Sequence, residues 1–353
     1  MKSTLSYFRG ALTFLVIGIG FAAYDGYMYG GMAGAWPAVL TMLMLAGLEI
    51  SMSMDNAVVN AGILKHMSPF WRKMFLTVGM FIAVFGMRAF FPLVIISITG
   101  GTSLLEAGKI ALFDHEKFQS IMLGAHMSIM GFGAAFLLMV GLNYFVQKEH
   151  ETIWIPVEKW FEKLPEGVIA RLVLGVLITT PVLAGVYITH PSEFQGFAIS
   201  IAVGFATYVL LDVIKAIVGG GDIAALAAKH GVLAFLWLEV IDASFSLDGV
   251  VGAFSITNDP VLIAIGCGLV GAMTVRDATV YLVETGKLDT YEYLEPGAMW
   301  AILALVTIMF VSAFGVHVPE VVAGGVSIMI IIAAVICSIK KNGLHDTMEL
   351  ENE

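Results

Sequence analysis

Long apolar runs, separated by short polar segments, follow one another along almost the whole chain. A helix of about 20 apolar residues crosses the roughly 30 Å of hydrocarbon in a bilayer, so each such run predicts one membrane-spanning helix. The runs fall at residues 11–34, 37–62, 74–98, 120–146, 168–188, 196–218, 231–256, 260–284, 298–316 and 320–339. The pattern therefore predicts an all-α fold, a polytopic membrane helical bundle of about ten transmembrane helices in a lipid bilayer.

The segments outside these runs predict smaller elements. The first run follows residues 1–10 without the small-residue cleavage site of a secretory signal, so we expect a retained first span. Residues 99–119 predict a connecting loop on the outer side. Residues 153–164 (IWIPVEKWFEKL) mix aromatic and charged side chains, which is typical of an amphipathic helix at the membrane interface.

Basic residues gather in every second loop and so orient the spans. They are Lys2 and Arg9; Lys65, Arg72 and Lys73; Lys148, Lys159 and Lys163; Lys229; Lys287; and Lys340 with Lys341. The remaining loops are mostly acidic. Because cytoplasmic loops carry an excess of Lys and Arg, both termini are predicted to be cytoplasmic, which agrees with an even number of spans.

Composition supports a membrane protein and narrows its partners. Of the 353 residues, 59% are hydrophobic and 13% are charged, with a mean hydropathy of +0.90. The net charge of -10 does not imply nucleic acid as a partner. Cys267 and Cys337 are isolated in apolar runs and are expected to be core residues, because no paired spacing of a metal site or disulfide is present.

One acidic motif occurs twice, in the second and in the seventh predicted span. Residues 49–56 read EISMSMDN and residues 242–249 read DASFSLDG, which agree without gaps on acid-x-Ser-x-Ser-apolar-Asp. A carboxylate at the centre of a membrane helix costs about 2.5 to 3.5 kcal/mol on insertion scales. Four such groups need a compensating partner or a cation, so function is to be sought at this motif.

The two copies of the motif run in opposite directions across the membrane, because the predicted second span enters from outside and the seventh from inside. Neighbouring spans also match. Residues 17–24 (IGIGFAAY) resemble residues 201–208 (IAVGFATY), and each following span carries an arginine, Arg88 or Arg276. We therefore predict a five-plus-five inverted repeat, an arrangement typical of secondary transporters, with the substrate site near the midplane.

This repeat divides the chain into two units. Residues 1–192 form the first, with five spans and a cytoplasmic amphipathic linker at 147–167, and residues 193–353 form the second, with five spans and a short acidic tail. A duplicated scaffold that only faces lipid is the alternative, but it leaves the buried acids unexplained. The oligomeric state stays open.

Helix geometry separates the two acids of each motif copy. At 3.6 residues per turn Glu49, Ser53 and Asn56 share one face, and Asp55 lies about 120° from Glu49. Either Asp55 reaches a different neighbour, or the helix is unwound around residues 51–56, as discontinuous transporter helices are at ion sites. In the second copy Glu239, Asp242 and Ser246 share a face, and Asp248 falls off it.

The oxygen atoms of these side chains predict the kind of ion that they bind. Carboxylate, amide and hydroxyl oxygens suit Mn²⁺, Mg²⁺ or Ca²⁺, and no His or Cys joins either copy. The candidate metal ligands are Glu49, Asp55, Asn56, Asp242 and Asp248, and further candidates for the metal or a coupling ion are Ser53, Ser246 and Glu239. The metal would be a transported substrate and no tightly bound cofactor is expected. The excess of acids makes protons a candidate coupling ion.

Arg88 and Arg276 lie near the middle of their predicted spans, where an arginine needs an acid. Each is either a structural counter-ion of Asp55, Asp248 or Asp277, or a gating partner that holds a carboxylate when the metal is absent. The sequence leaves both roles open.

One feature resembles an enzyme. Tyr24-Asp25 and the Gly219–Asp222 segment (GGGD) imitate the YD and GxGD pair of intramembrane aspartyl proteases. Asp222 falls in a predicted cytoplasmic loop, however, and no Pro-Ala-Leu motif follows. The chain is therefore predicted not to be an enzyme.

The two motif regions resemble the TerC family of bacterial integral membrane proteins. Leu48-Glu49 with Met54-Asp55-Asn56 is similar to that family's LE…DN motif, and Arg88 follows in the next span. Asp242-x-x-Phe-x-Leu-Asp248, Ile256-Thr-x-Asp-Pro260 and Arg276 are similar to its D…F.LDS…IT.DP…R pattern. The resemblance covers about residues 40–100 and 238–285.

The resemblance implies a fold of the lysine-exporter-like transporter superfamily, a bacterial inner-membrane location and efflux of metal ions, manganese above all. It also implies a link to tellurium resistance. Gly249 stands where the family usually has serine, the region between Arg88 and Gly231 is longer, and Val275 stands in place of the usual Gly-Leu before Arg276. These departures indicate a divergent branch. A membrane scaffold or assembly factor that binds metal without transporting it is the alternative function.

Overall fold

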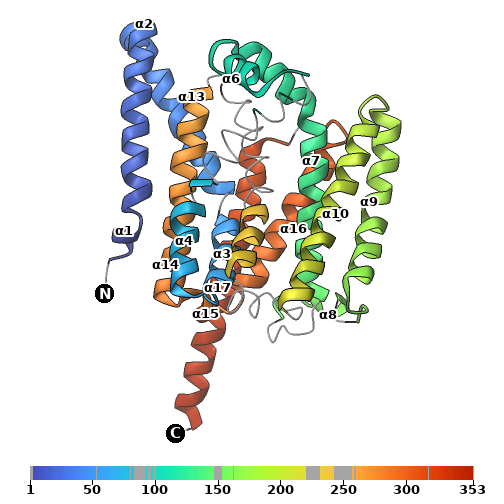
Figure 1. Ribbon diagram of the computed structural model, residues 1–353. Helices are drawn as coiled ribbons and strands as arrows, with labels where there is room; N and C mark the ends of the chain where they lie inside the picture. Colours follow the sequence, from blue (N-terminus) through green and yellow to red (C-terminus); the bar gives the residue numbers. More distant parts are fainter. Residues whose placement is uncertain are drawn as a thin grey trace.

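The computed structural model is a bundle of helices without strands in the part of the chain that it describes (Figure 1). It describes residues 3–52, 54–79, 81–82, 93, 97, 101–146, 153–161, 163–219, 231–241, 257, 260–316 and 318–352. The predicted all-α, polytopic helical bundle is confirmed.

The elements follow one another along the chain in this order: α1 (Thr4–Tyr7), α2 (Arg9–Met52), α3 (Met54–Leu64), α4 (Pro69–Met74), the π-helix η1 (Phe75–Gly79), α6 (Leu104–Phe113), α7 (His115–Val146), α8 (Glu158–Phe161), α9 (Val168–Thr189), α10 (Phe194–Gly219), the helix of residues 231–241, α13 (Pro260–Ile263), the π-helix η3 (Ala264–Gly271), α14 (Ala272–Thr285), α15 (Lys287–Thr290), α16 (Leu294–Ser312) and α17 (Glu320–Asn352).

Eight stretches within these helices are long and apolar enough to cross a membrane: Arg9–Met28, Gly30–Gly47, Leu123–Val146, Val168–Thr189, Phe194–Val213, Val261–Thr285, Leu294–Ser312 and Val322–Asn342. Each overlaps one of the ten predicted spans. The other two predictions, 74–98 and 231–256, lie mostly outside the described residues. Both ends of the chain lie on the same side of the bundle, as an even number of spans requires (Figure 1).

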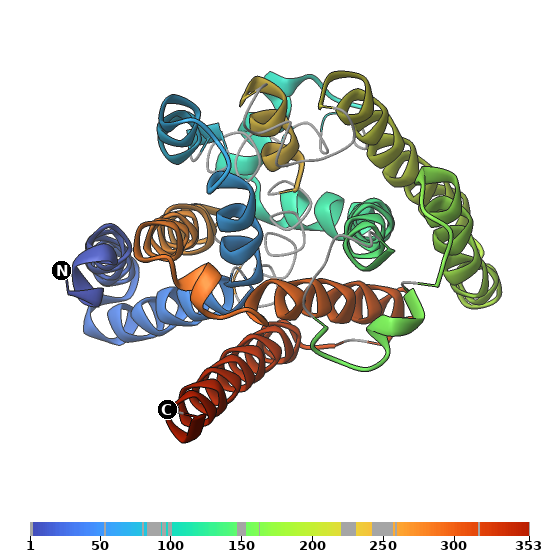
Figure 2. The ribbon, with the colours of Figure 1, turned by 90° about the horizontal axis from the view of Figure 1, so that it is seen from below.

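The most buried span is α7, which lies near the middle of the bundle (Figure 2). Within its segment Leu123–Val146, 83% of the apolar window is buried inside the protein, against 22% for Val168–Thr189 in α9. Phe136, Leu137 and Met139 of α7 are fully buried. Because α9 and α10 cover one side of α7 at the edge of the bundle, their outer faces are left for lipid.

A tight helical hairpin forms the first two spans, since α2 bends back on itself at Gly31. Gly31 has φ 60° and ψ −150°, a conformation that favours glycine. Beside the bend the two arms meet at Gly26 and Gly34, where a Cβ added to Gly26 would lie 2.5 Å from the Gly34 carbonyl oxygen. Small residues allow this approach of two membrane helices.

We expect the substitution Gly26→Ala to lower the thermal unfolding midpoint of the purified protein, because the added methyl group meets backbone that cannot move cheaply. Gly30→Ala is the matched control, since a Cβ at Gly30 meets nothing within 4 Å. Equal midpoints for the two variants would show that the arms are not held at Gly26.

The segment between the two predicted halves differs from the expected amphipathic helix. In its described part the helix is confined to the four residues of α8, and Glu158 is buried at 5% exposure. The Glu158 carboxylate accepts hydrogen bonds from the backbone N–H groups of Trp154 and Ile155 and from Trp300 Nε1. The Glu158 side chain thus ties the linker to α16, and these three donors offset the cost of burying it.

The segment predicted as an outer connecting loop, residues 99–119, is largely helical in its described part, which begins at residue 101. It contains α6, whose first turn is capped by Ser103, because the Ser103 hydroxyl accepts a hydrogen bond from the Glu106 N–H at 3.2 Å. Ser followed three residues later by Glu is a recognised start signal for a helix. α7 then begins at His115.

Candidate functional site

Glu49 lies in the last turn of α2, and its side chain is directed at the second π-helix. The residue is 3% exposed. A Cβ placed on Gly271, the last residue of η3, would overlap Glu49 Cγ and would lie 2.7 Å from Glu49 Cδ and 2.8 Å from Oε1. The carboxylate of the first motif copy therefore lies against the backbone of the second half of the chain.

Asp55 and Asn56 form the first turn of α3, and both are buried, at 0% and 1% exposure. The Asp55 Oδ1 atom accepts a hydrogen bond from the backbone N–H of Asn56 at 3.0 Å. Its other oxygen, Oδ2, has no hydrogen-bond partner among the described residues. A carboxylate oxygen that is fully buried without a donor is costly, so this atom marks a place where a cation would be stabilising.

Asn60 was not predicted from the sequence, although it lies one turn after Asn56 on nearly the same face of α3. It is 0% exposed, and neither Oδ1 nor Nδ2 has a hydrogen-bond partner within the part of the chain that the structure covers. The signal in the sequence was the i, i+4 pair of amides in an apolar helix. Asn60 joins the candidate site as a buried donor and acceptor.

Packing against α14 holds α3 in place. The Thr279 hydroxyl donates to the backbone carbonyl of Ala57 at 3.3 Å, and Ala57, Val275 and Ala278 form a small buried apolar cluster. The opposite turn of α3 faces α16, where a Cβ on Gly62 would lie 3.5 Å from Glu295 Oε1. The contacts with α14 therefore hold the start of α3, which bears Asp55 and Asn56.

The second motif copy, residues 242–249, lies outside the described residues, but Glu239, three residues before it, is described. This residue is 9% exposed and lies on the helix of residues 231–241. A Cβ on Gly79, the last residue of η1, would lie 2.6 Å from Glu239 Oε1. The other predicted positions Ser53, Arg88, Asp242, Ser246 and Asp248 lie outside the described residues, so their roles stay predictions.

Arg276 and Asp277 form an ion pair, with Arg276 Nη1 donating to Asp277 Oδ1 at 3.0 Å. The second Asp277 oxygen accepts from the backbone N–H of Ala11, and Arg276 Nε donates to the backbone carbonyl of Leu76 at 3.0 Å. The pair thus connects α14 to the start of α2 and to η1. Asp277 is thus the acid that pairs with Arg276 in the structure, and the choice between a structural and a gating role stays a prediction.

Another ion pair, in which both side chains are buried, joins α9 and α10. Arg171 Nη2 donates to Asp212 Oδ2 at 3.1 Å, and the two side chains are 7% and 10% exposed. Tyr208, which is fully buried, packs edge-on against Phe136 and Trp237 beside this pair. Arg171 was not predicted as a buried residue, because Arg171 lies near the predicted cytoplasmic end of the span 168–188.

No group of three or more His, Cys, Asp or Glu side chains that could hold a metal ion occurs among the residues for which positions are described. The structure brings Glu49 to Gly271 and Glu239 to Gly79, and it places Asp55 with Asn56 on α3. What the described residues offer chemically is a set of buried carboxylate and amide oxygens in a low-dielectric interior.

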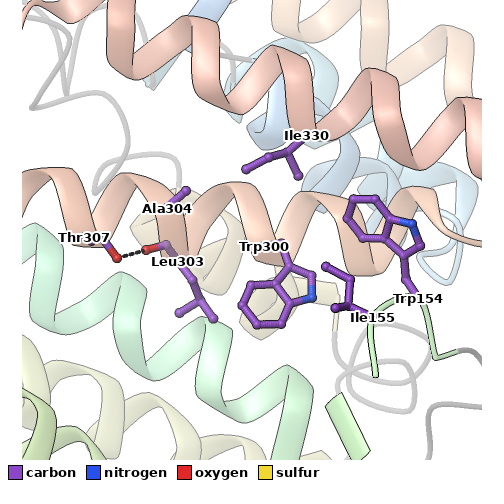
Figure 3. A pocket seen from close by; sticks show the side chains of 7 residues that line it. All are labelled: Trp154, Ile155, Trp300, Leu303, Ala304, Thr307 and Ile330. Carbon is purple, nitrogen blue, oxygen red and sulfur yellow. Dashed lines mark hydrogen bonds between the residues drawn. The ribbon is translucent and has the colours of Figure 1, made fainter. Parts of the chain in front are cut away.

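A pocket of about 260 Å³ lies between the linker and helices α16 and α17 (Figure 3). Its lining is Trp154, Ile155, Trp300, Leu303, Ala304, Thr307 and Ile330. The Thr307 hydroxyl donates a hydrogen bond to the backbone carbonyl of Leu303, so the donor of this lining side chain is already used within α16 (Figure 3). No carboxylate lines this pocket, and none of its lining residues belongs to the candidate site.

Comparison with known proteins identifies a family. The sequence model of a family described as "Protein of unknown function (DUF475)" matches residues 54–345, which is more than half of the chain. No curated protein and no solved structure matches. The match begins beside Asp55 and includes Asn60, Gly79, Glu239 and Gly271. The chain belongs to this family.

Proposed function

We propose that this member of the DUF475 family is a transporter of the bacterial inner membrane that exports a divalent metal cation, Mn²⁺ above all, by alternating access. Asp55, Glu49 and Asn56 would supply ligands from the first half, and Asp242 and Asp248 from the second. Both termini would lie in the cytoplasm. Protons would be the coupling ion.

The observation that carries this proposal is the fully buried Asp55, whose Oδ2 has no hydrogen-bond partner within the described part of the chain. A structural carboxylate in such a place is normally paired, as Asp277 and Asp212 are. An unpaired one needs either a proton or a cation. A group that alternates between the two is what proton-coupled export of a cation requires.

Packing between the two predicted halves supports alternating access. Helix α2 packs on η3 and α14, and α3 packs on α14, whereas Phe75 of η1 and Trp71 of α4 contact Phe235 on the helix of residues 231–241. The second predicted span thus meets the eighth, and the seventh meets the third. An inverted repeat would produce both contacts from one symmetry operation.

The resemblance to the TerC family supports manganese as the substrate. Glu49, Asp55 and Asn56 fall on the residues of the first motif, and all three are buried. Their oxygen ligands are hard, which suits Mn²⁺, Mg²⁺ and Ca²⁺ more than Cu⁺.

The test is an export assay in bacterial cells deleted for their own manganese exporters. Cells expressing the protein should hold several-fold less intracellular manganese than cells with an empty vector, as measured by elemental analysis, at equal membrane amounts of a tagged protein. Parallel challenges with Mg, Ca, Zn, Fe and tellurite define the substrate. Unchanged content of every metal would exclude export. Metal binding by the purified protein without export would identify the scaffold or assembly factor.

Proteoliposomes loaded with Mn²⁺ then test the coupling ion. Efflux that accelerates when protons are supplied on the opposite side, together with a change in internal pH, is the expected result. Efflux at a rate independent of the pH gradient would rule out proton coupling and leave manganese transport standing.

A further inference from the structure

We propose that Glu49 and Glu239, one carboxylate from each half, have matching roles and that glycines of the opposite half, Gly271 and Gly79, position them. The proposal rests on the function proposed above, since it names the residues that aim the acids of the same site. It adds two positioning residues to the predicted ligands and gives Glu239 a definite counterpart.

The first contact leaves no room for any other residue type. All three atoms nearest to a Cβ on Gly271 belong to Glu49, and the nearest, Cγ, would overlap it. Glu49 is 3% exposed and Gly271 is buried, so this contact lies inside the protein. The absent Cβ therefore determines where the Glu49 carboxylate lies.

The second contact, between Glu239 and Gly79, also joins a carboxylate and a glycine. The atom nearest to a Cβ on Gly79 is Glu239 Oε1 at 2.6 Å, followed by Phe75 Cδ2 at 2.9 Å and Phe235 Cε2 at 3.3 Å. Gly79 is buried, and the rings of Phe75 and Phe235 pack edge-on beside it, with centroids 6.1 Å apart. A carboxylate again lies against a glycine in an apolar frame.

The two contacts are reciprocal. Glu49 belongs to the second predicted span and meets the eighth, whereas Glu239 belongs to the seventh and meets the third. Exchanging the halves of a five-plus-five repeat places the pair of spans of one contact on the pair of spans of the other. Glu239 lies three residues before Asp242, the gap-free counterpart of Glu49, and therefore on the same helix face.

Both glycines lie in π-helical segments, Gly79 in Phe75–Gly79 and Gly271 in Ala264–Gly271. π-helical segments are uncommon and occur often at functional sites. A small change in winding there would shift the glycine along its carboxylate. In this way the position of each acid is linked to the helix of the other half, as alternating access between two halves needs.

The experiment is a pair of double-substitution cycles in the full-length protein, read by manganese export and by thermal unfolding of the purified protein. We expect Gly271→Ala and Gly79→Ala each to reduce the export rate at least about tenfold, because displacing a ligand by about 1 Å has effects of this size. The matched controls are Gly268→Ala in η3 and Gly47→Ala in α2, where a Cβ meets nothing within 4 Å. These controls should export like the wild type.

Thermal unfolding tests the Glu49–Gly271 and Glu239–Gly79 contacts independently of export. Gly271→Ala should lower the unfolding midpoint when Glu49 is present and should change it little in the Glu49→Ala background. Gly79→Ala should lower the midpoint less in the Glu239→Ala background than in the wild type, because Phe75 and Phe235 still lie near the added Cβ. Additive midpoints in both cycles, or wild-type export by both glycine variants, would overturn the positioning role. If the wild type itself does not export, the proposed function fails, and the two unfolding cycles still decide whether the glycines position the acids.

Discussion

Replacing Asp55 by asparagine is expected to abolish manganese export while leaving the protein folded and at least as stable. The change is nearly isosteric, so the packing of α3 is kept. It removes the negative charge and converts one oxygen into an N–H donor, which repels a cation. Because Asp55 is 0% exposed and its Oδ2 has no partner among the described residues, removing the charge should relieve a cost of burial.

Export is measured in exporter-deficient cells and stability by the unfolding midpoint of the purified protein, and we expect export to fall at least about tenfold with an unchanged or higher midpoint. The control is Asp289→Asn, which makes the same chemical change at a side chain that is 73% exposed. Export by the Asp55→Asn variant at the wild-type rate would show that Asp55 is not a ligand. A large loss of stability would show that the carboxylate is structural.

Much of the fold could be predicted because hydrophobic runs in a membrane protein are long. Eight predicted spans coincide with helices of the structure, and burial of Glu49, Asp55 and Asn56 agrees with a motif inside the bundle. Lipid excludes unpaired backbone, so an apolar run of this length has essentially one solution, a helix. Periodicity was therefore a strong guide to element type.

Side-chain partners could not be predicted in the same way. Glu158 reads as a surface residue of a linker, yet its partners Trp154 and Trp300 are 4 and 142 positions away. Gly271 reads as one of 38 glycines until Glu49 is placed beside it. Such contacts arise from tertiary packing between distant segments, and a single sequence contains no direct record of them.

The candidate site shows the same limit. Glu49 lies in α2 and Asp55 in α3, but residue 53 between them lies outside the described residues, so the predicted unwinding around residues 51–56 stays a prediction. The sequence did not identify Asn60, because one more amide in an apolar helix is unremarkable by composition. Its burial without hydrogen-bond partners in the described structure makes it notable, and burial depends on all the helices around α3.

Of the substitutions proposed for this protein, Arg171→Leu is expected to lower the free energy of unfolding most. Arg171 and Asp212 are 7% and 10% exposed, so removing the arginine leaves a buried carboxylate without its ion-pair partner. Breaking a buried pair in this way costs about 3 to 5 kcal/mol. The loss should appear as a lower thermal unfolding midpoint in detergent. Manganese export by the folded fraction should persist, because the pair lies between α9 and α10, apart from α3 and η3.

The double variant Arg171→Leu/Asp212→Leu separates the charge effect from lost packing. It removes both charges from an apolar environment, so it should recover most of the midpoint lost by Arg171→Leu. Lys65→Met is the matched surface control, because it breaks the exposed pair with Asp289 and should cost no more than about 1 kcal/mol. If the double variant is as unstable as Arg171→Leu, the arginine stabilises α9 and α10 through packing of its aliphatic chain, and the ion pair contributes little.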